Sequence, residues 1–307
     1  MSAKKMHFIS GLPRSGSTLL AALLRQNPRF HAGMSSPVGS LLSGMLNQFS
    51  AGSEFASVID AQQRKRLLQG LFENYYEAQA DKEVIFDTNR LWCAKLPTLL
   101  DLFPNAKVIA CVRNVAWIMN SIERLYRANP YENTKLFANF GGRSNVYNRL
   151  EMLAAHDQLV GFGWAATRDA FYGDDAHAML VIDYDLLAQA PEKVLPLIYQ
   201  FIGEPLFEHD FNNVEYDAPD FDLSLGVPGL HKVKPKVEWK PRRSIIPPDL
   251  FDKYSQMSFW HDPSGSAANV VAPQPLSQQK ESQQPKAQHI NQSASATQVT
   301  HEIFEGI

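Results

Sequence analysis

Cysteine is scarce in this sequence, which limits the kinds of site that the chain can build. The 307 residues include two cysteines, Cys93 and Cys111, and each lies in an apolar run. Such a pair is typical of reduced core thiols in a cytosolic protein, because disulfide frameworks and cysteine-ligated metals need more cysteines or a closer spacing. We therefore expect a cytoplasmic protein with neither a disulfide nor a metal site.

Long apolar runs and an excess of charge are also missing. No apolar run is long enough to span a bilayer, and the first residues lead within a few positions into a strand, without a signal segment. The net charge of −3 gives no support to general nucleic-acid binding. With 45% hydrophobic and 20% charged residues, the chain has the composition of an ordinary soluble enzyme. We expect neither a nucleic acid nor a membrane as its partner.

Short apolar strands alternate with helices along most of the chain. We expect strands near residues 8–11, 29–34, 83–87, 107–112 and 178–184, and helices over 19–26, 60–76, 95–102, 114–125, 147–172 and 191–203. This alternation predicts an α/β, P-loop-like three-layer fold, with a central parallel sheet flanked by helices. Ligands of such folds bind beyond the carboxyl ends of the strands.

The composition changes after the last of these helices. Residues 204–222 are acidic and irregular, residues 231–243 are basic, and the segment 246–249 opens a short last helix that ends around Trp260. Beyond it the chain is rich in Ser, Gln, Ala and Pro, which cannot offset the entropy of ordering. We therefore expect one domain over residues 1–262 and a disordered tail over residues 263–307.

The loop after the first strand has the spacing of a phosphate-binding loop. Gly11 and Gly16 are separated by four residues and followed by a helix, so backbone N–H groups and the helix N-terminus converge on one anion. A nucleotide-hydrolysing loop continues with lysine, whereas this chain has Ser17 at that position. The loop's cation is instead Arg14.

A second phosphate site is indicated where the strand 107–112 ends. Arg113 follows the strand, and Ser121 lies eight residues later, about two turns into the next helix. A guanidinium and a hydroxyl so placed fit a phosphate group away from the first loop. The alternatives are a salt bridge for Arg113 and an exposed or back-bonded helical hydroxyl for Ser121.

The missing lysine argues against phosphoryl transfer. A metal-dependent kinase or NTPase needs that lysine on the terminal phosphates and an acidic strand end to help hold magnesium. In this chain the best candidate for the strand that would supply this acid is 107–112, and it ends in Arg113 instead. Both features fit a donor with a fixed second phosphate and a reactive sulfuryl group, which needs no metal.

These motifs resemble those of the sulfotransferase superfamily, which uses 3′-phosphoadenosine 5′-phosphosulfate (PAPS). Residues 12–18 look like its 5′-phosphosulfate loop in the arginine form of tyrosylprotein sulfotransferases, and residues 103–113 with Ser121 look like its 3′-phosphate motif. The strand ending at Tyr184 and the Ile-Pro-Pro-Asp run at 246–249 are further similarities. The resemblance spans about residues 6–260.

The resemblance implies a PAPS site without a metal. Its donor-binding residues would be Pro13, Arg14, Ser15, Gly16, Ser17, Thr18, Arg113, Ser121 and Tyr184, with Arg242 and Arg243 closing over the donor. Arg14 would also act in catalysis, by stabilising the charge that develops at the bridging oxygen. For the basic segment 231–243, a solvated charged loop is the alternative.

The catalytic base departs from the resemblance. Tyrosylprotein sulfotransferases place a glutamate after the second strand, but residues 32–37 of this chain contain no carboxylate. The candidates are Asp87, His31 and His231, because a base must reach the acceptor hydroxyl directly or through one water. We rank Asp87 first, since it ends a strand beside the loop, although it could instead pair with Arg14 or Arg90.

The sequence therefore predicts a PAPS-dependent sulfotransferase whose acceptor stays open. A peptidyl tyrosine of a peptide or protein is favoured by the arginine loop, and a small-molecule or glycan hydroxyl is the alternative. A metal-dependent kinase and a non-catalytic nucleotide-binding module are the competing functions. Both a monomer and a homodimer are compatible with the sequence.

Overall fold

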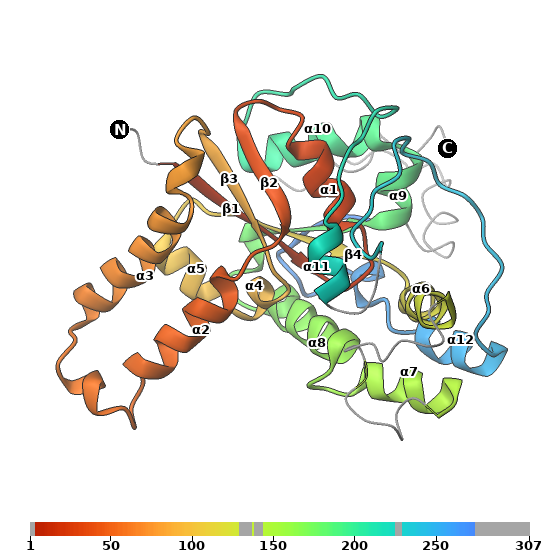
Figure 1. Cartoon of the computed structure of the whole chain (residues 1–307), viewed down its shortest axis with the longest axis horizontal. Coiled ribbons are helices and arrows are strands. Elements are labelled where there is room, and N and C mark those ends of the chain that lie inside the picture. Colours follow the sequence, from red (N-terminus) through yellow and green to blue (C-terminus); the bar gives the residue numbers. More distant parts are fainter. Residues whose placement is uncertain (1–3, 129–136, 138–143, 225–228, 274–307) are drawn as a thin grey trace, which may run out of the picture.

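The computed structural model describes residues 4–128, 137, 144–224 and 229–273. These residues form a six-stranded parallel sheet with the order β2-β3-β1-β4-β5-β6. Figure 1 labels the strands β1 to β4 of this sheet. The strands are β1 (Lys5–Gly11), β2 (Phe30–Ser35), β3 (Val84–Thr88), β4 (Val108–Val112), β5 (Met179–Asp183) and β6 (Asn269–Val271). The predicted central parallel sheet is confirmed.

Helices cover both faces of this sheet, as the three-layer prediction requires. One face packs against α1 (Ser17–Leu24), α9 (Tyr184–Gln189) and α10 (Pro191–Ile202). The other face packs against α2 (Val38–Phe49), α3 (Ala61–Tyr75), α4 (Leu91–Ala94), α5 (Leu96–Leu102), α6 (Val115–Ala128), α7 (Val146–Ala154), α8 (Leu159–Tyr172) and α12 (Pro248–Ser255). Buried strand residues alternate between the two cores, since neighbouring side chains point to opposite faces.

The register of the central strands fixes where the first loop begins. Gly11 at the end of β1 pairs with Cys111 of β4, and its φ angle of 105° lies in the region that favours glycine. A Cβ on Gly11 would lie 2.1 Å from the carbonyl oxygen of Cys111. The loop can therefore leave the sheet this close to β4 only with glycine at this position.

Two predicted helix starts are confirmed by their capping hydrogen bonds. The Asp60 carboxylate accepts from the backbone N–H of Gln63 at 2.8 Å, and the Gln63 side chain accepts from the Asp60 N–H at 2.9 Å. At the start of α6, the Asn114 side chain accepts from the N–H of Ala116 at 3.0 Å. Both contacts satisfy donors that a helix leaves unpaired at its first turn.

The structure differs from the predicted elements in several places. The predicted helix over 147–172 is interrupted at residues 155–158, between α7 and α8, and this turn reaches the cavity described below. The helices α2, α4, α9 and α11 (Pro219–Ser224) are not among the predicted elements. Of these, α4, α9 and α11 have only four to six residues, so packing rather than local periodicity defines them.

The sixth strand corrects the predicted end of the domain at residue 262. Residues 269–271 pair with 180–182 of β5, and Val271 is buried. This strand covers the outer edge of β5, so the folded part extends beyond residue 262. The remainder of the predicted tail, residues 274–307, lies outside the described residues. None of the described helices is long and apolar enough to cross a membrane.

Candidate functional site

A cavity of about 680 Å³ opens beyond the carboxyl ends of β1, β3 and β4. Its walls come from the loop after β1, the ends of β2 and β3, the helix α6, the turn before α8, and the start of α9. The remaining wall is the segment 229–243, which we call the strap. Its lining residues come from 230–234, 236–238, 240 and 242. The site therefore lies at the edge of the sheet where the fold predicts a ligand.

The loop is held open as a cradle by its small residues. Gly16 has a φ angle of 92°, and a Cβ there would lie 2.6 Å from the ring of Tyr184. The buried Ser15 hydroxyl donates to the carbonyl oxygens of Leu12 at 2.5 Å and Cys111 at 2.8 Å. Ser15 therefore braces the loop from behind. The residues of the predicted loop site that line the cavity are Pro13, Arg14, Gly16, Ser17 and Thr18.

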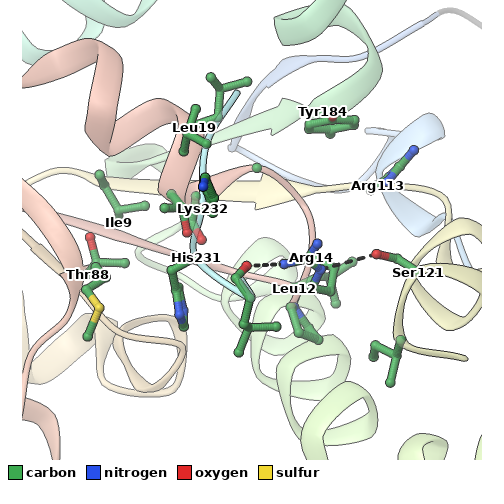
Figure 2. Close-up of a pocket in the computed structure, with 18 of the residues that line it drawn as sticks. Ile9, Leu12, Arg14, Leu19, Thr88, Arg113, Ser121, Tyr184, His231 and Lys232 are labelled. Atoms are coloured by element: carbon green, nitrogen blue, oxygen red, sulfur yellow. Dashed lines mark hydrogen bonds between the residues drawn. The ribbon is translucent and has the colours of Figure 1, made fainter. Parts of the chain in front are cut away.

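Arg14 connects the loop to two distant walls of the cavity. Its Nε donates to the Ser121 hydroxyl at 3.2 Å, and another guanidinium N–H donates to the carbonyl oxygen of Leu230 in the strap (Figure 2). Its backbone φ of 58° is a left-handed conformation, which costs a non-glycine residue about 1–2 kcal/mol. Burial, followed by repulsion from Arg113, lowers the pKa of Arg14. The chain holds a strained, crowded cation in its loop, where an anion would relieve the repulsion.

Arg113 lies beside Tyr184 at the opposite side of the cavity from Thr88 (Figure 2). Its guanidinium carbon lies 4.4 Å from the centre of the Tyr184 ring, and its Nε lies 3.7 Å from an Asp185 carboxylate oxygen. This Nε is buried and has no hydrogen-bond partner among the described residues. The salt bridge considered as an alternative is present but long, and it leaves a buried donor free for a ligand.

The strap supplies one of its two predicted arginines to the cavity. Arg242 lines the cavity, whereas Arg243 does not, and the Arg243 carbonyl accepts a hydrogen bond from Arg124 outside it. The strap also contributes lysines that were not predicted as site residues: Lys232, Lys234, Lys236 and Lys240. The basic segment therefore covers the cavity with positive charge.

Asp87, the base ranked first, is not among the residues that line the cavity. Its carboxylate is fully buried and accepts hydrogen bonds from Ser36 at 2.7 Å, Tyr76 at 2.6 Å and Trp92 at 2.9 Å. Burial raises the pKa of Asp87, and these donors oppose the shift. It pairs with neither Arg14 nor Arg90. Asp87 anchors the Ser36 turn instead of facing an acceptor, so its assignment as the base is corrected.

Of the two candidate histidines, His231 lines the cavity and His31 does not. His31 lies on β2 with its ring 5.3 Å from that of Tyr76, and burial lowers its pKa. The Nδ1 of His231 lies 2.5 Å from an Asp222 carboxylate oxygen, and the second oxygen accepts from the His231 backbone N–H at 2.9 Å. Asp222 is fully buried. A buried carboxylate on Nδ1 fixes the orientation of the His231 ring in the cavity.

The comparison with known proteins agrees with this geometry. The family model described as "Sulfotransferase family" matches residues 7–209, about two thirds of the chain. The chain belongs to the sulfotransferase family. No curated protein gives a significant match to this chain.

Solved sulfotransferase structures are similar to this sulfotransferase in fold. The sulfotransferase domain from the curacin biosynthetic pathway is 18% identical, with a TM-score of 0.53, and the match covers 83% of this chain and 97% of that one. A sulfotransferase from Alicyclobacillus acidocaldarius is 16% identical, with a TM-score of 0.44, over 73% of this chain and 90% of that one. At 18% identity the likeness to the curacin domain shows the fold alone, and nothing is argued from the second structure.

Besides the strap lysines, the carboxylate that contacts His231 from outside the cavity lining was not predicted from the sequence. Asp222 precedes His231 by nine residues in a segment without periodicity, so no spacing rule connects the two. The acidic character of residues 204–222 was the available signal, and it did not single out one carboxylate. Among the described residues, no three His, Cys, Asp or Glu side chains lie close enough together to hold a metal ion.

Proposed function

We propose that this sulfotransferase transfers the sulfuryl group of PAPS to an acceptor hydroxyl, with His231 as the base and Asp222 as its orienting partner. The observation that carries the proposal is that His231, held by the buried Asp222, lines the same cavity as the phosphate loop. Figure 2 draws His231 near Arg14, with Arg113 and Tyr184 farther along the cavity. A base, a cradle for a leaving phosphate and a second anion site are thereby combined.

The described residues fit the two anionic ends of PAPS. The loop offers backbone N–H groups, the N-terminus of α1 and the Arg14 guanidinium to the 5′-phosphosulfate. The unpartnered Nε of Arg113 suits the 3′-phosphate, with Tyr184 beneath the same guanidinium. The Ser121 hydroxyl, which the sequence assigned to the 3′-phosphate, accepts a hydrogen bond from Arg14. Arg242 supports the 3′ end from the strap.

The proposed step is an in-line displacement at sulfur. The acceptor oxygen loses its proton to the imidazole of His231 and forms a bond to sulfur, while the bond from sulfur to the 5′-phosphate oxygen breaks. Arg14 and the loop N–H groups stabilise the negative charge that the leaving phosphate gains, an effect worth about 3–4 kcal/mol for each donor. The products are a sulfate ester, adenosine 3′,5′-bisphosphate and protonated His231.

The size of the cavity favours a small acceptor. Its volume of about 680 Å³ lies within the range that holds one drug-sized ligand, and the donor would occupy much of it. The strap further encloses the space above the loop. We therefore propose a small-molecule hydroxyl as the acceptor, and a peptidyl tyrosine, which the arginine loop favours, is the second candidate to be tested.

The proposal is tested by incubating the protein with PAPS and a panel of phenols, alcohols and tyrosine peptides. We expect a sulfate-sized mass gain on an acceptor and stoichiometric release of adenosine 3′,5′-bisphosphate. The rate of turnover should be the same with and without a metal chelator. His231→Gln should lose about a hundredfold or more in kcat. His177→Gln, which changes an exposed histidine outside the cavity, should match the wild type.

Three other outcomes would redirect the assignment. Donor binding without turnover by any acceptor would indicate a non-catalytic binding module. Magnesium-dependent protection by ATP, without protection by the donor, would indicate a kinase. Full activity in His231→Gln would remove His231 from the mechanism.

A further inference from the structure

Arg90 lies in the turn between β3 and α4 and lines the cavity. The turn is anchored by its backbone and by Asn89. The Arg90 carbonyl accepts from the Ser10 hydroxyl at 3.1 Å, and the Asn89 side chain accepts from the Leu91 N–H at 3.0 Å and donates to the Ser36 carbonyl at 3.3 Å. The backbone that carries the Arg90 guanidinium is therefore held firmly beside the cavity.

The guanidinium of Arg90 has no ion-pair or hydrogen-bond partner among the residues that the structure describes. The nearest carboxylate in the sequence, Asp87, is fully buried and bonded to Ser36, Tyr76 and Trp92. The side chain is accessible to solvent, yet the walls around it lower the pKa of Arg90 by desolvation, and no neighbouring acid opposes this effect. A cation in this setting gains from an anionic ligand.

The topology separates Arg90 from the donor phosphates. Arg90 follows β3 and Arg113 follows β4, and these strands lie on opposite sides of β1, which carries the loop. Each predicted phosphate group already has its own cation, Arg14 in the loop and Arg113 beyond it. Arg90 therefore lines the cavity on the same side of the loop as Thr88 at the end of β3, on the other side from Arg113.

The cavity wall carries an excess of positive charge. Eight cationic side chains line it: Arg14, Arg90, Arg113, Lys232, Lys234, Lys236, Lys240 and Arg242. The acids among the lining residues are Asp157 and Glu238, and Glu238 pairs with Lys240 at 2.7 Å. Two donor phosphates account for part of this positive charge, and the remainder selects an additional anion.

We propose that Arg90 binds a carboxylate or phosphate group on the acceptor, so that the acceptors are small hydroxyl compounds that also carry an acid group. This inference rests on the proposed function, because it needs a donor in the loop and an acceptor beside His231. Arg90 acts on specificity: it orients the acceptor through its acid group and takes no part in the bond changes at sulfur.

The test compares acceptors that differ in charge but hardly in shape. The matched pairs are para-hydroxyphenylacetate with its amide and beta-hydroxybutyrate with its amide. We expect the wild type to favour the acid member of a pair by about tenfold or more in kcat/KM, as for a charged hydrogen bond. Arg90→Gln should lose this preference mainly through KM, and Arg90→Lys should recover part of it.

Two controls separate this inference from the proposed function. Arg66→Gln removes an exposed arginine of α3 outside the cavity and should leave both the rate and the preference unchanged. Calorimetry with adenosine 3′,5′-bisphosphate should give equal affinities for the wild type and Arg90→Gln. If the wild type itself does not bind this product, the proposed function fails, whatever the role of Arg90.

The inference is overturned by any of four results when the donor product binds normally. Equal rates with acid and amide, or a preference that survives in Arg90→Gln, would exclude Arg90 as the acid-binding residue. No turnover of any acid, or faster sulfation of an acidic tyrosine peptide than of every small acid, would exclude the acceptor class. Weaker binding of the donor product in Arg90→Gln would assign the residue to the donor site.

Discussion

Arg14 carries both the charge and the strain of the phosphate loop. Its left-handed backbone costs about 1–2 kcal/mol, and glycine at this position would avoid that cost while adding about 0.5–1 kcal/mol of unfolded-state entropy. We expect Arg14→Gly to change the free energy of unfolding by less than about 1 kcal/mol, although it abolishes turnover. Denaturant titration and the donor-dependent rate measure the two effects separately.

Arg14→Ala is the matched comparison, since alanine keeps the strain and removes the guanidinium. It should be equally inactive and less stable than Arg14→Gly by roughly 1 kcal/mol. Near-normal turnover in either variant would show that the loop N–H groups suffice without the guanidinium. A large loss of donor affinity with unchanged kcat would place the role of Arg14 in binding instead of in the transition state.

His7 gives the fold a pH dependence of its own. Burial lowers the pKa of His7 from 6.5 to about 4, and its Nδ1 accepts from the Lys107 N–H at 3.1 Å. A depressed pKa in the folded state means that stability is full above pH 6.5 and falls as the pH approaches 4. The loss should approach 3 kcal/mol, about 1.4 kcal/mol for each unit.

The difference in unfolding free energy between the wild type and His7→Gln isolates this contribution, because all other groups are shared. Between neutral pH and about pH 4, the wild type should lose about 3 kcal/mol of unfolding free energy relative to His7→Gln. A difference that stays constant with pH would show that His7 titrates normally in the folded protein.

At the scale of elements, a buried ion pair holds α7 against α6. The carboxylate of Glu123 is fully buried and accepts from Arg149 at 2.8 and 2.6 Å, while Arg127 bonds to one of its oxygens at 2.7 Å. Removal of Arg149 leaves the buried Glu123 carboxylate with the half-exposed Arg127, and breaking a buried pair costs about 3–5 kcal/mol. We expect Arg149→Met to destabilise the protein by this amount in chemical unfolding.

Arg127→Met is the control on the same helix, because the Arg127 side chain is 49% exposed and forms an ordinary i,i+4 pair. It should cost less than about 1 kcal/mol. Similar costs for the two variants would mean that Glu123 is stabilised by something other than its buried arginine.

Elements with a local signature were predictable from the sequence, and elements defined by packing were not. Asp60 with Gln63, and Asn114 with Ala116, form caps that can be recognised from a few consecutive residues. The helix break at residues 155–158 contains no proline or glycine that would predict it from the sequence. Its position at the cavity wall can be seen only in the folded chain. The short helix α11 could not be recognised locally, because the contact of its Asp222 is with His231, nine residues later.

The same distinction holds for the site. The loop and Arg113 were predictable because each follows a strand with a fixed spacing. Asp87 was wrongly ranked as the base, since the sequence shows that it ends a strand but not to which face its side chain points. Its pairing with Ser36, Tyr76 and Trp92 depends on β2, α3 and α4 meeting in space. The His231–Asp222 pair likewise requires the folded strap.

For the whole molecule, the sixth strand predicts where the chain can be shortened. Removal of residues 263–307 takes away β6 and the buried Val271, whose burial contributes about 1.5–3 kcal/mol. We expect the melting temperature to fall by about 4 °C or more in scanning calorimetry. Removal of residues 274–307 alone keeps β6, and an equal fall in that variant would contradict a stabilising role for the strand.

The central claim is that the cavity binds a nucleotide through two separate phosphate sites without a metal. Calorimetry in the presence of a chelator, with adenosine 3′,5′-bisphosphate and with adenosine 5′-phosphate, tests it most directly. The account predicts that the 3′-phosphate adds about 1.5–3 kcal/mol of affinity in the wild type and that Arg113→Ala loses this gain. Equal affinities for the two nucleotides, unchanged affinity in Arg113→Ala, or no binding at all would contradict it.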